Sequence, residues 1–140
     1  MIKIVGFNFR KINVEKTSDT FKDLKINTKI DISAIEEAKS EFLKGDDQIL
    51  KIKFIYTIEY NPNIANIVLE GNIVLTASKD EAKKILDGWK DKKMSEAFRI
   101  SLFNMILRKS NVKALQLEEE MNLPLHIPFP SLKAAKKEDK

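Results

Sequence analysis

The residues that could carry acid–base or metal chemistry are few, and their spacing does not suit a catalytic site. His126 is the only histidine and cysteine is absent, so one subunit can form neither a histidine-rich metal site nor a cysteine or histidine-supported serine nucleophile. The acidic clusters at residues 36–37, 46–47 and 118–120 stand among lysines, which is typical of solvated surface charge. We therefore expect no enzyme activity, no catalytic residue and no bound metal, and we interpret His126 as a packing residue.

Glycine-rich phosphate loops are also missing from the sequence. The chain has four glycines, and none lies in a Walker or dinucleotide-binding pattern. We expect no nucleotide and no other cofactor. With enzymes and nucleotide-dependent proteins excluded, we expect a protein that acts by binding.

Aromatic and basic residues alternate near the N-terminus, a pattern that some proteins use to bind single-stranded nucleic acids. Phe7 and Phe9 could stack on bases while Arg10 and Lys11 hold phosphates. Because the two phenylalanines share one face of an expected strand, packing in the core or at an interface is the favoured interpretation. The net charge of +4 comes partly from the C-terminal tail, so nucleic acid is kept only as the alternative partner, bound through lysines on a sheet face.

Length and composition indicate a single globular domain. Of the 140 residues, 43% are hydrophobic and 33% are charged. No apolar run approaches the roughly 20 residues of a membrane span, and the N-terminus lacks the pattern of a secretion signal. We expect one domain over residues 1–132, a flexible charged tail over residues 133–140, no membrane association and a cytoplasmic location, which the absence of cysteine fits.

Apolar residues alternate with polar ones in four stretches, which predicts four strands. The first stretch changes phase near Gly6 and changes back before Ile12, which predicts a bulged or bent strand. Residues 61–63 mark the turn of a hairpin, and Gly71 marks a bulge or a close contact. Residues 33–47 could extend the second strand as far as Gly45 or form a short helix, and both possibilities remain open. The predicted strands are residues 2–14, 24–32, 50–60 and 66–76.

Two helices are predicted after the strands. Ser78 and Glu81, three residues apart, form a capping box that starts a short helix. A second, amphipathic helix begins at Ser95, and we expect it to break at Asn111, with a further short helix over residues 115–121. Strands followed by helices give an α+β fold.

The most informative stretch is residues 123–130, with the sequence L-P-L-H-I-P-F-P. It is strongly apolar, yet its prolines exclude a helix interior or a central strand. Apolar side chains on such an extended segment must cover the protein's own surface, a partner subunit or a ligand. Phe21 and Leu24, in a polar connection, belong to the same class, and we interpret both regions as candidate binding surfaces.

The order of these elements and several local patterns resemble the SecB family of export chaperones. The resemblance rests on the opening strand, on the run L-K-I-N-T-K-I-D at residues 24–31 and on the hairpin over residues 50–75. It rests also on the long helix that leads into the proline-containing segment at residues 123–129. It spans most of the chain and is a resemblance of pattern.

The resemblance implies a four-stranded antiparallel sheet with a long helix at the subunit interface, usually in a homotetramer built as a dimer of dimers. It implies an ATP-independent holdase of the protein-transport type, which binds unfolded or nascent polypeptides along apolar grooves and prevents their aggregation. The positions that match the grooves of the family, and are implied to bind the client, are Phe21, Leu24, Leu123, Leu125, Ile127 and Phe129.

The sequence departs from the family pattern in two places, and both bear on which kind of chaperone we expect. The loop after the first strand, residues 16–23, is shorter than in the bacterial chaperones and has no tryptophan. The polar sheet face carries Lys25, Lys29, Lys51 and Lys53, where the export chaperones present acidic surface to their motor ATPase. We therefore expect a general holdase, or a chaperone dedicated to one client like the antitoxin-linked members, rather than a partner of that motor.

Overall fold

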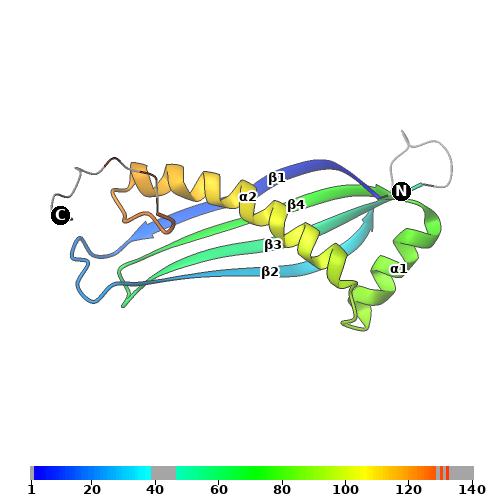
Figure 1. The fold of residues 1–140 in the computed structure, drawn as a ribbon, viewed down its shortest axis with the longest axis horizontal. Coiled ribbons are helices and arrows are strands. Elements are labelled where there is room, and N and C mark those ends of the chain that lie inside the picture. Colours follow the sequence, from blue (N-terminus) through cyan, green and yellow to red (C-terminus); the bar gives the residue numbers. More distant parts are fainter. Residues whose placement is uncertain (1, 39–46, 129, 131, 133–140) are drawn as a thin grey trace, which may run out of the picture.

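The computed structural model describes residues 2–38, 47–128, 130 and 132, and these form an α+β fold (Figure 1). Phe129 and residues 133–140, the expected tail, lie outside the described residues. No helix within the described ranges is long and apolar enough to cross a membrane. The elements are β1 (Lys3–Lys16), β2 (Lys25–Ala38), β3 (Gln48–Asn61), β4 (Ala65–Ala77), α1 (Lys79–Lys90) and α2 (Glu96–Glu120).

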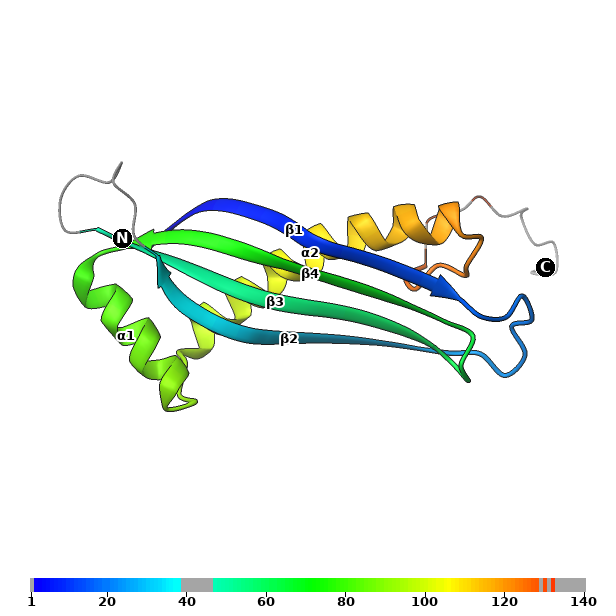
Figure 2. The ribbon, with the colours of Figure 1, turned by 180° about the vertical axis from the view of Figure 1, so that it is seen from behind.

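The four strands form one antiparallel sheet in the order β1-β4-β3-β2. Each strand is 13 or 14 residues long, well above the usual length of about 5–6 residues. The long helix α2 lies diagonally across one face, and α1 lies at the end of the sheet where β4 finishes (Figure 1). Among the described residues no helix covers the other face (Figure 2). The expected fold class and the four-stranded antiparallel sheet are confirmed.

The edge strand β1 contains the predicted irregularity. Its register with β4 shifts between Ile4 and Gly6 and again between Phe9 and Lys11. Each shift moves the following residues to the opposite face of the strand. Phe7 and Phe9 therefore lie on the same side as Ile4, toward α2, and both pack against the core.

Gly71 makes a close contact with two neighbouring strands. A Cβ atom at this position would meet the backbone carbonyl of Asn8 and the ring of Phe54. The ring centroid of Phe54 lies 5.2 Å from that of Phe7 and 6.3 Å from that of Phe9. The missing side chain at Gly71 thus leaves room for a cluster of three aromatic rings.

The second strand resolves part of the question left open by residues 33–47. β2 continues as a strand to Ala38, with a register shift between Ile32 and Ala34. A helix is therefore excluded for residues 33–38. Residues 39–46, which include Gly45, lie outside the described residues.

Both helices begin at the predicted caps. The Ser78 hydroxyl accepts the N–H of Glu81 at 3.2 Å, and the Glu81 carboxylate accepts the N–H of Ser78 at 3.0 Å. This is a complete capping box, and it fixes the first turn of α1. The Ser95 hydroxyl accepts the N–H of Phe98 at 3.4 Å and starts α2.

The helix α2 is continuous over 25 residues, so the break expected at Asn111 is wrong. Asparagine disfavours a helix when its side chain bonds to its own backbone. Here the Asn111 side chain instead accepts the Tyr56 hydroxyl proton across the helix–sheet interface at 2.5 Å. The short helix expected over residues 115–121 is the last part of α2.

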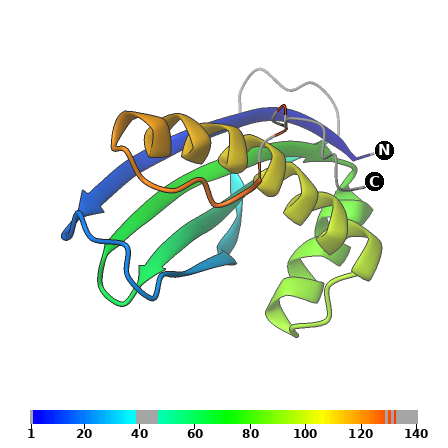
Figure 3. The same cartoon turned by 60° about the vertical axis from the view of Figure 1, so that its left-hand side comes forward.

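A left-handed turn ends α2 and reverses the chain. Leu123 donates its N–H to the carbonyl of Glu118 at 2.9 Å, and Asn122, at φ 53°, donates to that of Glu119 at 3.4 Å. This is a Schellman arrangement with asparagine in the left-handed position. The residues that follow therefore run back toward the start of the helix (Figure 3).

Candidate functional site

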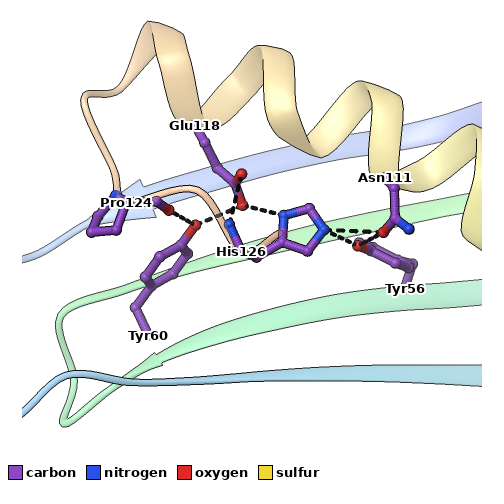
Figure 4. A network of polar contacts seen from close by, with 6 residues as sticks. All are labelled: Tyr56, Tyr60, Asn111, Glu118, Pro124 and His126. Carbon is purple, nitrogen blue, oxygen red and sulfur yellow. Dashed lines mark hydrogen bonds and ion pairs between the residues drawn. The ribbon is translucent and has the colours of Figure 1, made fainter. Parts of the chain in front are cut away.

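The proline-containing stretch after α2, residues 123–128, is called the return segment. It lies beside the C-terminal half of α2 and above the sheet (Figure 3). A network of six residues from β3, α2 and the segment itself holds it there (Figure 4). The members of the network are Tyr56, Tyr60, Asn111, Glu118, Pro124 and His126.

Glu118 is the centre of this network. Its Oε2 lies 2.7 Å from Nδ1 of His126, and its Oε1 accepts the backbone N–H of His126 at 3.2 Å. The hydroxyl of Tyr60 lies 2.6 Å from Glu118 Oε2 and 2.7 Å from the carbonyl oxygen of Pro124, and its single proton can go to either. The side chains of Glu118 and His126 are 0% and 2% exposed. An acidic side chain is therefore held in the core by donors from two other elements.

The far side of the imidazole contacts β3 and an earlier turn of α2. Nε2 of His126 lies 3.0 Å from the Tyr56 hydroxyl and 3.0 Å from Oδ1 of Asn111. His126 thus joins the return segment to both layers of the fold. This agrees with the interpretation of His126 as a packing residue, although its contacts are polar.

Burial and the Glu118 carboxylate act together on the two tyrosines. Burial raises the pKa of Tyr56, and the charge of Glu118 raises it further. Burial is also the largest cause of the raised pKa of Tyr60, followed by its hydrogen bond to Glu118. Both hydroxyls therefore stay protonated at neutral pH, as donors to the network.

The expectation that residues 118–120 are all solvated is wrong for Glu118, which is fully buried. The physical reason is its position on the helix. Residues 102, 106, 110, 114 and 118 follow one another at spacings of four, and all five are buried. The available signal was local: Glu118 is adjacent to Leu117 and four residues after Ala114, and residues four apart are neighbours on a helix surface.

The loop after β1 lies at the same end of the sheet as the return segment (Figure 1). Lys16 connects this loop to the end of α2, two residues before the return segment. Its Nζ donates to the carbonyl oxygen of Met121 at 3.1 Å, pairs with Asp19 at 3.0 Å and lies 5.7 Å from the ring centroid of Phe21. The structure therefore places at one end of the sheet the two regions that the sequence indicated as binding surfaces (Figure 1).

The six predicted client-binding residues differ in exposure. Phe21, Leu24 and Ile127 are half-buried, and the first two pack against the core. Leu123 is 5% exposed and belongs to the core, whereas Leu125 is 37% exposed. Phe129 lies outside the described residues. Binding by any of the six stays a prediction.

Leu125 lines a shallow groove on the outer side of α2, with a volume of about 480 Å³. Val112 and Leu115 supply most of the remaining apolar lining, with Gln116 and Glu119 at the border. Val112 is 57% exposed. An exposed apolar groove of this kind suits the side chains of another polypeptide.

A second hollow, of about 460 Å³, lies at the other end of α2, between α1 and β2. Its apolar side chains are Ile32, Trp89, Met94 and Phe103, and its charged ones are Asp31, Lys92 and Arg99. Sequence reasoning did not predict it. The available signal was a tryptophan and a methionine around the short connection between the two helices.

The open face of the sheet carries both lysines and acidic residues. Lys29 pairs with Glu59 at 3.2 Å, and Lys53 pairs with Glu36 at 2.8 Å. The hydrogen bond and charge of Lys53 lower the pKa of the Glu36 carboxyl. Two of the four lysines expected to form a positive face are therefore paired with acids.

No protein-family model and no curated protein matches the sequence. Among solved structures, the fold is similar to that of a SecB-like chaperone of Mycobacterium tuberculosis in complex with a ChAD peptide from the HigA1 antitoxin, with a TM-score of 0.52. The chain has the SecB-like fold. The match covers 96% of this chain and 93% of the other. The sequence identity is 12%, so the similarity is one of fold. It confirms the fold that the sequence resemblance implied.

Proposed function

We propose that this protein is a cytoplasmic, ATP-independent holdase that binds unfolded or nascent polypeptides and prevents their aggregation. The observation that carries the proposal is the exposed apolar groove between Leu125 and Val112, on a SecB-like fold. Exposed aliphatic side chains accept many partner side chains without reading a sequence. The proposal includes no nucleotide and no catalytic step.

A peptide in an extended form is the client that fits this surface. The lining also includes Gln116 and Glu119, which can bond to a peptide backbone while the apolar residues contact its side chains. The similar chaperone from M. tuberculosis was solved with a peptide from an antitoxin. A single dedicated client is therefore as consistent with the proposal as a broad range.

We propose further that the protein assembles as a dimer of dimers. The helix α2 carries apolar residues on its outer side as well as toward the sheet, and Ile100, near the start of the helix and outside the groove, is 47% exposed. A helix that is apolar on both sides usually packs between two layers. Light scattering tests this, and a particle at the monomer mass of 16.1 kDa would contradict it.

Aggregation of a client diluted from denaturant tests the holdase proposal. Equimolar protein should suppress aggregation equally with and without ATP. The double variant Leu125→Ser, Val112→Ser removes the exposed groove and should lose at least about fivefold in client affinity. Ile55→Thr is the matched control, because Ile55 lies on the open face and threonine keeps its β-branched shape.

Two outcomes would contradict the proposal. Unchanged affinity in the double variant would remove the groove from the binding site. Failure to suppress aggregation of several clients would refute a general holdase, and isolation of bound polypeptides from cells would then test for a dedicated client.

Nucleic acid remains the less supported alternative. The pairs of Lys29 with Glu59 and of Lys53 with Glu36 reduce the positive potential of the open face. If this face bound single strands, the affinity would fall steeply with added salt. Titration of a labelled oligonucleotide at two salt concentrations measures this, and we expect no salt-dependent binding.

A further inference from the structure

Both ring nitrogens of His126 face oxygen atoms. Nδ1 lies 2.7 Å from Oε2 of Glu118. Nε2 lies 3.0 Å from the hydroxyl oxygen of Tyr56 and 3.0 Å from Oδ1 of Asn111. A ring nitrogen without a hydrogen is an acceptor, so it gains nothing from a contact with an oxygen that also only accepts.

The proton of Tyr56 is already used. It lies in the 2.5 Å contact with Oδ1 of Asn111, an oxygen that has no hydrogen to donate. The Tyr56 oxygen therefore presents lone pairs to Nε2, and so does Oδ1. Nε2 can bond to the Tyr56 oxygen or to Oδ1 of Asn111 only if it carries a hydrogen. Nδ1 likewise needs a hydrogen to bond to the Glu118 carboxylate. The contacts thus fit an imidazolium, in which both ring nitrogens carry a hydrogen.

Among the described residues, Glu118 is the one charged group that faces the His126 ring. From α2, Glu118 and Asn111 face the ring, and from β3 the neutral hydroxyl of Tyr56 faces it, with Tyr60 behind Glu118. From β1, Lys16 reaches only the carbonyl of Met121, before the return segment, and is itself paired with an acid. The Glu118–His126 pair is 0% and 2% exposed, so water does not screen it.

We propose that His126 is a proton-dependent latch that fastens the return segment to α2 and β3. In its protonated form it makes charge-assisted bonds on both sides. When it loses a proton, Nε2 faces two acceptors and Glu118 becomes a buried charge without a cation. The closed segment is therefore more stable when the ring carries both hydrogens than when it has lost one.

Opening of the latch would displace Leu125, one residue from His126, and reshape the groove that Leu125 lines. The latch itself rests on the contacts of His126. Its role in regulating client binding rests also on the proposed holdase function, and the two are tested by separate measurements.

Nitrogen NMR tests the latch directly, because the single histidine gives the only imidazole signals of the chain. We expect both ring nitrogens to carry a hydrogen at the lower end of the pH range in which the protein stays folded, and one of them to lack it at the upper end. A neutral ring throughout, which a reversed amide of Asn111 would allow, overturns the proposal. An imidazolium that persists unchanged to the upper limit also overturns it, because no proton is then released.

Hydrogen exchange measures the opening. Between the same two pH values, the protection factors of the Leu125, His126 and Ile127 amides should fall about tenfold, the difference between a charge-assisted and a neutral hydrogen bond. His126→Gln should abolish this dependence on pH, and Glu118→Gln provides a second variant should the first fail to fold. Glu120→Gln, at an exposed position on the same helix, is the matched control and should keep the dependence. Protection that does not change with pH in the natural protein, or that changes equally in His126→Gln, overturns the latch.

Client binding at the two pH values tests the regulation. With reduced, alkylated α-lactalbumin as an unfolded client, the affinity should differ by at least about fivefold in the natural protein and not in His126→Gln. Equal affinity at both pH values overturns the regulatory role. No binding at either value refutes the holdase function and with it the regulation, while the NMR result on the latch stands.

Discussion

The two faces of the sheet are made by the same strands but depend on different interactions. The side chains of β3 that face α2 are almost completely buried, and the hydroxyls of Tyr56 and Tyr60 bond to Asn111 and Glu118 of the helix. On the open face, ion pairs such as Lys29–Glu59 stand in water. Exposed pairs are screened and contribute little, whereas a buried polar group that loses its partner is costly. Stability and geometry therefore depend mainly on the covered face.

The largest effect is expected from Glu118→Ala. It removes the acceptor of His126 and Tyr60 in the core, and we expect a loss of about 3–5 kcal/mol in the free energy of unfolding. Urea denaturation at neutral pH measures it. Glu120→Ala, on an exposed turn of the same helix, is the control and should change stability by less than about 0.5 kcal/mol. A loss for Glu118→Ala as small as that of the control would show that the network does not hold the two layers together.

Gly71→Ala should have the next largest effect. The added methyl group would meet the Asn8 carbonyl and the Phe54 ring, and backbone cannot move away as a flexible side chain can. We expect a loss of about 1–3 kcal/mol. Gly6→Ala is the matched control in the neighbouring strand, because its Cβ would have only an ordinary contact with Val74 at 3.7 Å. Equal stability of the two variants in thermal unfolding would contradict the close approach at Gly71.

The open face should respond much less. Lys29→Ala breaks the ion pair with Glu59, and the expected loss is about 0.2–1 kcal/mol, decreasing with added salt. Denaturation at low and high salt measures both quantities. A loss that matches that of Glu118→Ala, and that salt does not reduce, would remove the distinction between the two faces.

The smallest effect concerns the titration of Glu36. Its pKa is lowered in the folded protein by the hydrogen bond and charge of Lys53, so the pair contributes stability above the unfolded-state pKa and loses it as the pH falls through the folded-state pKa. In Lys53→Ala, carboxyl NMR should show the Glu36 pKa raised toward its ordinary value. An unchanged titration would mean that the pair at 2.8 Å does not persist in solution.

The strands were predictable because the covered face imposes a strict alternation on them. The apolar positions of β3 repeat every second residue over its full length, and the phase changes in β1 correspond to its two register shifts. The capping box at Ser78 and the N-cap at Ser95 were predictable for a similar reason, since each depends on residues within a single turn.

The polar network was not predictable in full, because its members lie far apart along the chain. Tyr56 and Asn111 are 55 residues apart, and their pairing depends on how α2 crosses the sheet. Asn111 was misinterpreted as a helix break because local propensity disregards a partner on another element. The ion pairs of the open face were missed for the same reason, since they depend on the register between β2 and β3.

Lys16 gives the molecule a mechanical connection between regions that are distant along the chain. One ammonium group touches the last turn of α2, the loop that holds Asp19 and the ring of Phe21. Substitution of this one side chain would therefore remove contacts of the loop and of the helix end at the same time.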